Sequence, residues 1–94
     1  MGTREDVKQA LAAFAAAVPG RAVEIRGPPY GAARAVRGDG PRRGTPRALV
    51  ECGGPTWLAL VRGELLWADA VAAGRVEASG ERSDLSKWLP LART

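Results

Sequence analysis

The sequence predicts a fold of mixed helices and strands, in the order helix, three strands, two helices, strand and helix. Three observations carry this prediction. Residues 3–18 place apolar side chains at spacings of four and three, which is the period of a helix. By contrast, "RAVEIRG" at residues 21–27 alternates apolar and polar side chains, as a half-buried strand does. Gly63 and Gly74 then end two short helical segments, since glycine suits the left-handed residue that follows a helix.

The first helix is expected over residues 3–18. Thr3 is its predicted cap, with Asp6 three places on as in a capping box, and Pro19-Gly20 ends it. Its polar face carries both charge signs, so we expect it to pack on a sheet rather than to bind a membrane. The predicted apolar stripe consists of Val7, Leu11, Phe14 and Val18.

Four strands are expected, in residues 21–27, 32–37, 47–52 and 75–80. The first three are joined by short or medium connections, which favours an antiparallel meander. Val36 leaves the register of the second strand open, because it follows Ala35 directly and both are apolar. The predicted inward positions are Val23, Ile25, Ala33, Ala35, Val50, Cys52, Val76 and Ala78.

Three helices are expected in the second half. Thr56 is predicted to cap a short helix that ends at Gly63, and a second one contains Trp67, Ala70 and Val71. Ser83 is predicted to cap a last helix in residues 84–91. Its apolar residues are Leu85, Trp88 and Leu89.

Length and composition set the class of protein. A chain of 94 residues, 46% of them hydrophobic, fits one globular domain over residues 1–94. The apolar stretch near the N-terminus is preceded by acidic residues, unlike a signal peptide, and no apolar run reaches the roughly 20 residues of a membrane span. Cys52 is the single cysteine, so we expect no internal disulfide and a cytoplasmic location.

The net charge of +4 does not predict a nucleic-acid partner. The densest basic stretch, residues 34–47, lies among glycines and prolines, which indicates a solvated loop. Tyr30 is the one aromatic residue near it, whereas proteins that bind single strands interleave basic residues with several stacking aromatics.

Catalysis is not predicted either. The chain has no histidine, which removes the usual general base, and Cys52 is expected to act as a small buried hydrophobe. Glu24, Glu51 and Glu77 are expected on the outer sheet face among arginines, where they form cross-strand charge pairs. We therefore predict no catalytic residue, no metal ligand and no cofactor.

Residues 56–91 resemble the C-terminal half of the sterol carrier protein type two family, in particular its short bacterial branch. The marks are a short helix into Gly63, a helix with Ala70 ending at Gly74, a strand with Val76, and Gly80 before a last segment with Leu85. A weaker match extends back to residue 22. The resemblance implies an α+β fold, with helices over one face of a mostly antiparallel sheet of about four strands. It also implies an apolar cavity between the layers that binds sterols, fatty acids or acyl-CoA.

Two interpretations of the apolar residues between the layers stay open. An empty cavity of about 300 Å³ would cost on the order of 7 kcal/mol at about 24 cal/mol per Å³, which rivals the stability of a small domain. The protein therefore either carries a lipid or another apolar small molecule, or it has a filled core and docks on a protein partner, with Trp88 as the residue for such docking. The pocket-lining residues predicted for the first case are Phe14, Val23, Ile25, Trp57, Leu60, Val61, Trp67, Val71, Trp88 and Leu89.

Overall fold

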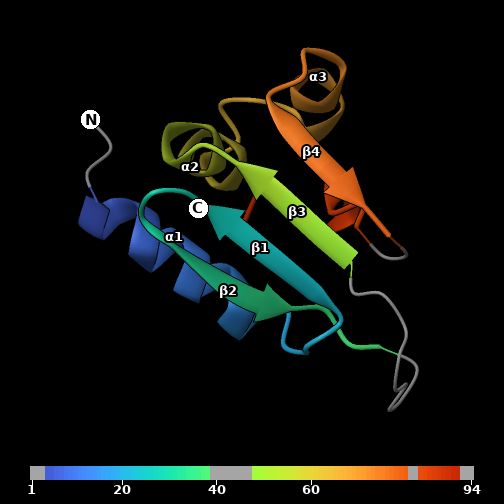
Figure 1. Ribbon diagram of the computed structural model, residues 1–94. Helices are drawn as coiled ribbons and strands as arrows, with labels where there is room; N and C mark the ends of the chain where they lie inside the picture. Colours follow the sequence, from blue (N-terminus) through green and yellow to red (C-terminus); the bar gives the residue numbers. More distant parts are fainter. Residues whose placement is uncertain (1–3, 39–47, 81–82, 92–94) are drawn as a thin grey trace.

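The computed structural model describes residues 4–38, 48–80 and 83–91 (Figure 1). The expected order of elements is confirmed up to the last strand. The helices and strands are α1 (Arg4–Ala17), β1 (Val23–Gly27), β2 (Gly31–Ala35), β3 (Ala48–Cys52), α2 (Gly54–Arg62), α3 (Trp67–Ala72) and β4 (Val76–Ser79), and a single 3₁₀ turn, η1, covers Ser86–Trp88. The predicted cap Thr3 and most of the basic loop, residues 39–47, lie outside the described residues.

The four strands form one sheet in the order β2-β1-β3-β4. β1 pairs antiparallel with β2 and β3 pairs antiparallel with β4, but β1 and β3 run parallel to each other. The predicted α+β class and mostly antiparallel sheet are confirmed. The predicted antiparallel meander of the first three strands is wrong, because β3 pairs with β1 and runs parallel to it.

The position of β3 explains the error. Val23 pairs with Ala35 of β2 on one side and with Ala48 of β3 on the other, so the end of β2 and the beginning of β3 flank the same end of β1. This arrangement makes β1 a central strand, which suits its side chains: Val23 and Ile25 are fully buried. A meander would have left β1 at an edge, with these two side chains less covered.

Helices α1 and α2 cover the inner face of the sheet (Figure 1). Of the predicted stripe, Val7, Leu11 and Phe14 are buried, whereas Val18 follows the end of α1 and is half-buried. Phe14 meets Trp57 of α2 edge to face, with ring centroids 5.3 Å apart and an angle of 80° between the planes. Such aromatic pairs contribute about 0.5–1.5 kcal/mol beyond the area that they bury. This contact joins the two helices above the sheet.

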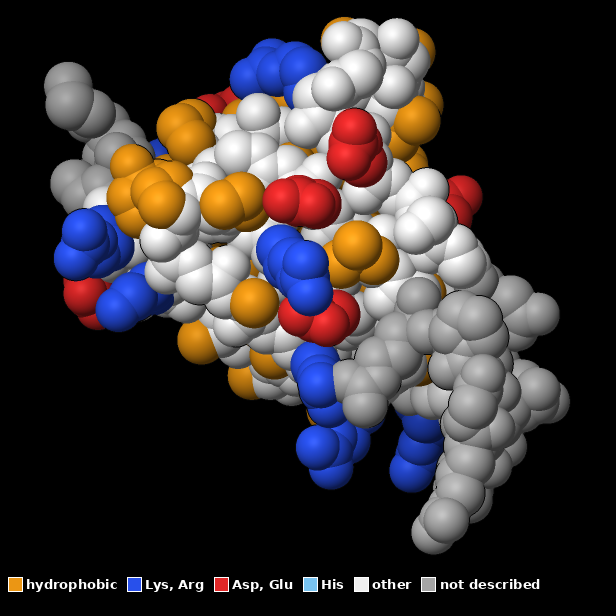
Figure 2. Space-filling view, viewed as in Figure 1, with side chains coloured by type: hydrophobic (Ala, Val, Ile, Leu, Met, Phe, Trp, Pro, Cys, Tyr) orange, Lys and Arg blue, Asp and Glu red, His pale blue; other side chains and the backbone are white. Residues whose placement is uncertain are grey.

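The outer face of the sheet carries alternating charges (Figure 2). In the strand register Glu24 lies opposite Arg34, and Arg26 lies opposite Glu51. Arg26 also donates a hydrogen bond to Glu24 at 2.9 Å. The ion pair thus lies within β1, and the register alone places opposite charges on neighbouring strands. At one position it does the reverse: Glu51 lies directly opposite Glu77, and two like charges in that position repel.

Two of the predicted inward positions are less covered than expected. Ala78 is exposed and Ala33 is half-buried, whereas the other six positions are buried. Ala33 and Ala78 belong to β2 and β4, the two edge strands, of which β4 buries Val76 alone. The helices cover the centre of the sheet more fully than its edges.

The predicted helix over residues 84–91 is wrong, because only η1 forms there. Pro90 has no backbone N–H to continue a helix. Ser83 does not cap a helix and donates instead to the carbonyl oxygen of Gly80, at 2.9 Å. The Ser86 amide donates to the Asp84 carboxylate at 2.9 Å, which closes a local turn and lowers the pKa of that carboxyl.

The predicted cap of α2 is also wrong. The helix begins at Gly54, after Gly53, and Pro55 lies in its first turn. Proline is tolerated there because backbone N–H groups in the first turn of a helix make no hydrogen bond within the helix. Thr56 is inside the helix and buried, and its hydroxyl accepts a hydrogen bond from Arg75 at 3.2 Å. The predicted end at Gly63 is confirmed, since Gly63 has the left-handed conformation, with φ 81°.

Among the described residues, no helix is long and apolar enough to cross a membrane.

Candidate functional site

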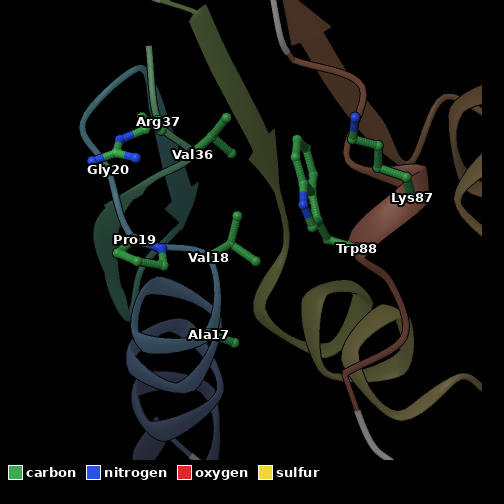
Figure 3. A pocket seen from close by; sticks show the side chains of 8 residues that line it. All are labelled: Ala17, Val18, Pro19, Gly20, Val36, Arg37, Lys87 and Trp88. Atoms are coloured by element: carbon green, nitrogen blue, oxygen red, sulfur yellow. The ribbon is translucent and has the colours of Figure 1, made fainter.

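A groove of about 590 Å³ lies between the end of α1 and the C-terminal segment (Figure 3). Its volume falls within the range of about 300–1,000 Å³ that is common for small-molecule sites. The groove is lined by residues from three separate parts of the chain. The described lining residues are Ala17, Val18, Pro19, Gly20, Val36, Arg37, Lys87 and Trp88.

One wall of the groove is the turn from α1 into β1 together with the end of β2. Val36 has φ 70°, a conformation that a β-branched residue adopts rarely and at a cost of about 1–3 kcal/mol. Two backbone hydrogen bonds hold it there: its amide donates to Val18 at 2.8 Å, and its carbonyl accepts from Ala22 at 2.9 Å. This conformation lets Ala35 and Val36, neighbours in sequence, both be buried.

The same wall of the groove can form only with glycine at position 20. It has φ 148°, and a Cβ atom added to it would lie 2.2 Å from the carbonyl carbon and oxygen of Val36. No real Cβ contact is that short, so the turn closes against Val36 only because residue 20 has no side chain.

The other wall is the C-terminal segment, with Trp88 facing Val18 and Val36 across the groove (Figure 3). Leu85, fully buried, anchors this segment before η1. After η1, the Leu91 amide donates to the carbonyl oxygen of Val61 at 3.0 Å, and Pro90 lies beside Gly63. Trp88 is thus fixed from both sides while its ring stays half-buried.

The ten predicted pocket residues lie in three environments. Seven are buried in one continuous core with Phe14 and Trp57 at its centre: Phe14, Val23, Ile25, Trp57, Leu60, Val61 and Trp67. Trp88 and Leu89 are half-buried against that core, and Val71 is 42% exposed on α3. Of the ten, Trp88 lines the groove. That the others contact a ligand stays a prediction.

Sequence reasoning missed the other seven lining residues, which include Arg37 and Lys87. The available signals were Pro19-Gly20, interpreted only as the end of a helix, and the break in alternation at Val36. A β-branched residue that breaks the alternation of a strand marks a place where the backbone turns, and here it turns into the groove wall.

Trp57 leaves one buried polar group without a partner. Its side chain is fully buried, and its indole Nε1 has no hydrogen-bond partner among the described residues. An unmade hydrogen bond of this kind costs about 1–3 kcal/mol. This penalty is as large as or larger than the contribution of the Phe14 contact, so the apolar area that the whole indole buries is what offsets it.

Cys52 is buried at the end of β3, as expected of a small hydrophobe. Burial raises the pKa of its thiol to about 11, and the negative charge of Glu51 adds to the effect. At neutral pH the thiol is protonated and is a poor nucleophile. Within residues 4–38, 48–80 and 83–91, no three His, Cys, Asp or Glu side chains gather as they would to hold a metal ion.

The model of one protein family, described as bacterial SCP ortholog, matches residues 2–91. The chain belongs to the bacterial SCP ortholog family. This confirms the resemblance to the short bacterial branch of the sterol carrier proteins and fits the observed α+β fold. Membership suggests lipid binding in general, and the proteins of this family are generally non-catalytic carriers. No curated protein matches the sequence closely enough to count as a relative.

Proposed function

We propose that this protein is a non-catalytic carrier of a single lipid-like molecule, which it holds in the groove between the end of α1 and the C-terminal segment. The ligand class is that of sterols, fatty acids or acyl-CoA, as in the wider sterol carrier family. The observation that carries the proposal is the groove itself, which combines a ligand-sized volume with a half-buried tryptophan.

The chemistry of the groove supports an apolar occupant. Val18, Val36 and Trp88 face one another across it, and they offer aliphatic and aromatic surface to a hydrocarbon chain or ring (Figure 3). Burial of apolar surface contributes about 25 cal/mol per Å², so a ligand that fills such a groove gains several kcal/mol from contact with these side chains.

The chemistry of the nucleophilic and acidic residues supports the non-catalytic part. The Cys52 thiol is buried and protonated, histidine is absent from the sequence, and Glu24 on the outer sheet face is paired with Arg26. A buried free thiol also fits a reducing compartment, and we propose the cytoplasm as the place of action.

The first test is native mass spectrometry of the freshly purified protein, compared with its organic extract. We expect a bound mass that reappears in the extract, or uptake of added palmitate or cholesterol by the lipid-free protein. A protein that stays lipid-free and takes up neither of these nor an acyl-CoA contradicts the proposal.

Tryptophan emission then locates the ligand. In Trp88→Phe the change on lipid addition should be lost, because Trp88 lines the groove. Trp67→Phe is the matched control, since Trp67 lies on α3 outside the lining residues and its removal should leave the change intact. If Trp67→Phe instead loses the change in emission and Trp88→Phe keeps it, the ligand lies outside the groove, among the predicted core positions.

The alternative function, docking on a protein partner, is favoured by one feature. Leu66 is 64% exposed and Val71 is 42% exposed, at the start of α3 and within it. Large apolar side chains in solvent favour an interface. Under this alternative, Leu66→Ser with Val71→Ser would abolish capture of a specific partner and leave lipid uptake unchanged.

A further inference from the structure

The outer face of the sheet has no described helix over it, since α1 and α2 lie on the inner face (Figures 1 and 2). Residues that pair in the strand register share a face, so the outer residues form two rows across the order β2-β1-β3-β4. The first row is Arg34, Glu24, Leu49 and Ser79, and the second is Ala32, Arg26, Glu51 and Glu77.

The two halves of this face differ in net charge. Strands β2 and β1 contribute Arg34, Arg26 and Glu24, of which the last two bond to each other at 2.9 Å. Strands β3 and β4 contribute Glu51 and Glu77 and hold no basic residue. The face is therefore net positive over β2 and β1 and net negative over β3 and β4.

The acidic half contains an unfavourable contact. Glu51 lies directly opposite Glu77, and like charges in that position repel. Arg26 flanks Glu51 on its other side, but Glu77 belongs to an edge strand and has Glu51 as its one neighbour in the ladder. Arg75 precedes β4, yet it donates to the Thr56 hydroxyl of α2 at 3.2 Å. A basic side chain from outside this sheet would stabilise Glu77.

A second copy of the chain can supply that side chain. Two outer faces that meet about a two-fold axis, parallel to the strands and between β1 and β3, place β1 over β3 and β2 over β4. Sheets that pack face to face lie about 10 Å apart with strand directions within about 30°. Arg26 then faces Glu51 of the second copy, and Arg34 faces the strand that carries Glu77 of the second copy. The two-fold symmetry makes each contact occur twice.

We propose that two copies of this protein associate through their outer sheet faces as a symmetric dimer. The basic residues Arg26 and Arg34 of each copy lie against the acidic residues Glu51 and Glu77 of the other, and the half-buried Leu49 of each copy lies within the contact. None of these residues lines the groove, so the inference does not rest on the proposed function.

The size of the face predicts a weak dimer. Four strands about 4.8 Å apart, each with about five residues of 3.3 Å, span roughly 19 by 17 Å. This footprint is well below the roughly 800 Å² per partner of a stable interface, and its charges favour recognition more than affinity. We therefore expect a reversible dimer that is half formed at a concentration of about 0.1 mM at low salt.

Sedimentation equilibrium of the full chain, from about 10 μM to 1 mM, measures the association. At low salt the mean mass should rise from that of the monomer toward twice that value. Between about 20 mM and 500 mM salt the association constant should fall at least about tenfold, because salt screens exposed charges.

Charge exchange at the two edge strands gives the sharpest test. Glu77→Arg and Arg34→Glu each bring like charges together across the interface, so each should weaken association at least about tenfold. An equimolar mixture of the two variants should associate again, because the arginine of β2 in one variant then meets the glutamate of β4 in the other. The two introduced side chains meet as well. Equal melting temperatures establish that both variants are folded.

Glu64→Arg and Arg62→Glu are the matched controls. They make the same changes of charge at exposed positions outside the sheet, and the association constant should stay within about twofold of the wild-type value. Lipid uptake is a separate measurement and should be the same in all four variants, so that failure of the dimer leaves the proposed function standing.

Three results would overturn the inference. A wild-type chain that is still monomeric at about 1 mM and low salt does not form this dimer. A dimer that survives both Glu77→Arg and Arg34→Glu uses another surface. If each variant loses the dimer but their mixture does not restore it, the two charges do not face each other.

Discussion

Trp57 and Trp88 are the same residue type in two opposite situations. Trp57 is fully buried between α1, α2 and the sheet, and it pairs with Phe14. Trp88 is half-buried on a three-residue turn, beside a groove and under the ammonium group of Lys87. The first tryptophan belongs to the core, whereas the second lines a groove, because α2 is enclosed by its neighbours and η1 lies at the edge of the groove.

The largest expected effect comes from removal of the core tryptophan. Trp57→Ala should lower the free energy of unfolding by about 3–5 kcal/mol, which is most of the stability of a small domain. Trp88→Ala should lower it by only about 1 kcal/mol, since the ring is already partly in solvent. Thermal and urea unfolding followed by circular dichroism measure both values. Equal losses for the two variants would remove the distinction between core and groove.

The next effect tests the groove wall. Gly20→Ala should cost about 2–4 kcal/mol, because the new Cβ would clash with the Val36 carbonyl and the backbone has φ 148°. Gly53→Ala is the control: a Cβ there meets nothing within 4 Å, and its cost should stay below about 1 kcal/mol. Unfolding midpoints compare the two variants. A Gly20→Ala protein as stable as Gly53→Ala would mean that the turn does not close on Val36.

A third effect concerns the core at high pH. Because the pKa of Cys52 is raised to about 11 in the folded protein and lies near 9 in the unfolded chain, its contribution to stability is fully present below pH 9. The contribution is lost as the pH rises from 9 through 11, since the unfolded state then releases the proton first. Urea unfolding of the wild type and of Cys52→Ala over this range measures the difference. The wild type should lose more stability with pH than the variant does, and parallel curves would contradict a buried thiol.

The smallest effect is expected on the outer face of the sheet, far from both tryptophans. Glu77→Lys places opposite charges across the β3–β4 ladder, where Glu51 now opposes a like charge. The change should stabilise the protein by about 0.2–1 kcal/mol at low salt and by less at high salt. Glu64→Lys, an exposed change of the same charge outside the sheet, is the control. A similar gain from both variants would trace the effect to net charge rather than to the Glu51 pair.

The local elements could be predicted from the sequence because their signals lie within a few residues. The spacing of Val7, Leu11 and Phe14 determined which face of α1 is buried, and the alternation around Val23 and Ile25 determined which face of β1 is. Gly63 ended α2 because a left-handed residue favours glycine. The order and spacing of these elements were also enough to predict the family, which the match over residues 2–91 confirms.

The tertiary structure decided the features that depend on distant residues. β3 pairs with the free side of β1 rather than with β2, and this pairing covers Val23 and Ile25 fully. The alternation in the sequence shows which side chains of a strand point inward, but it does not show which strands are neighbours. The groove likewise joins residues 17–20, 36–37 and 87–88, which meet only after the sheet and α1 have packed. The strain at Val36 persists for the same reason: hydrogen bonds to Val18 and Ala22 enforce it, and those partners arrive from a different segment of the chain.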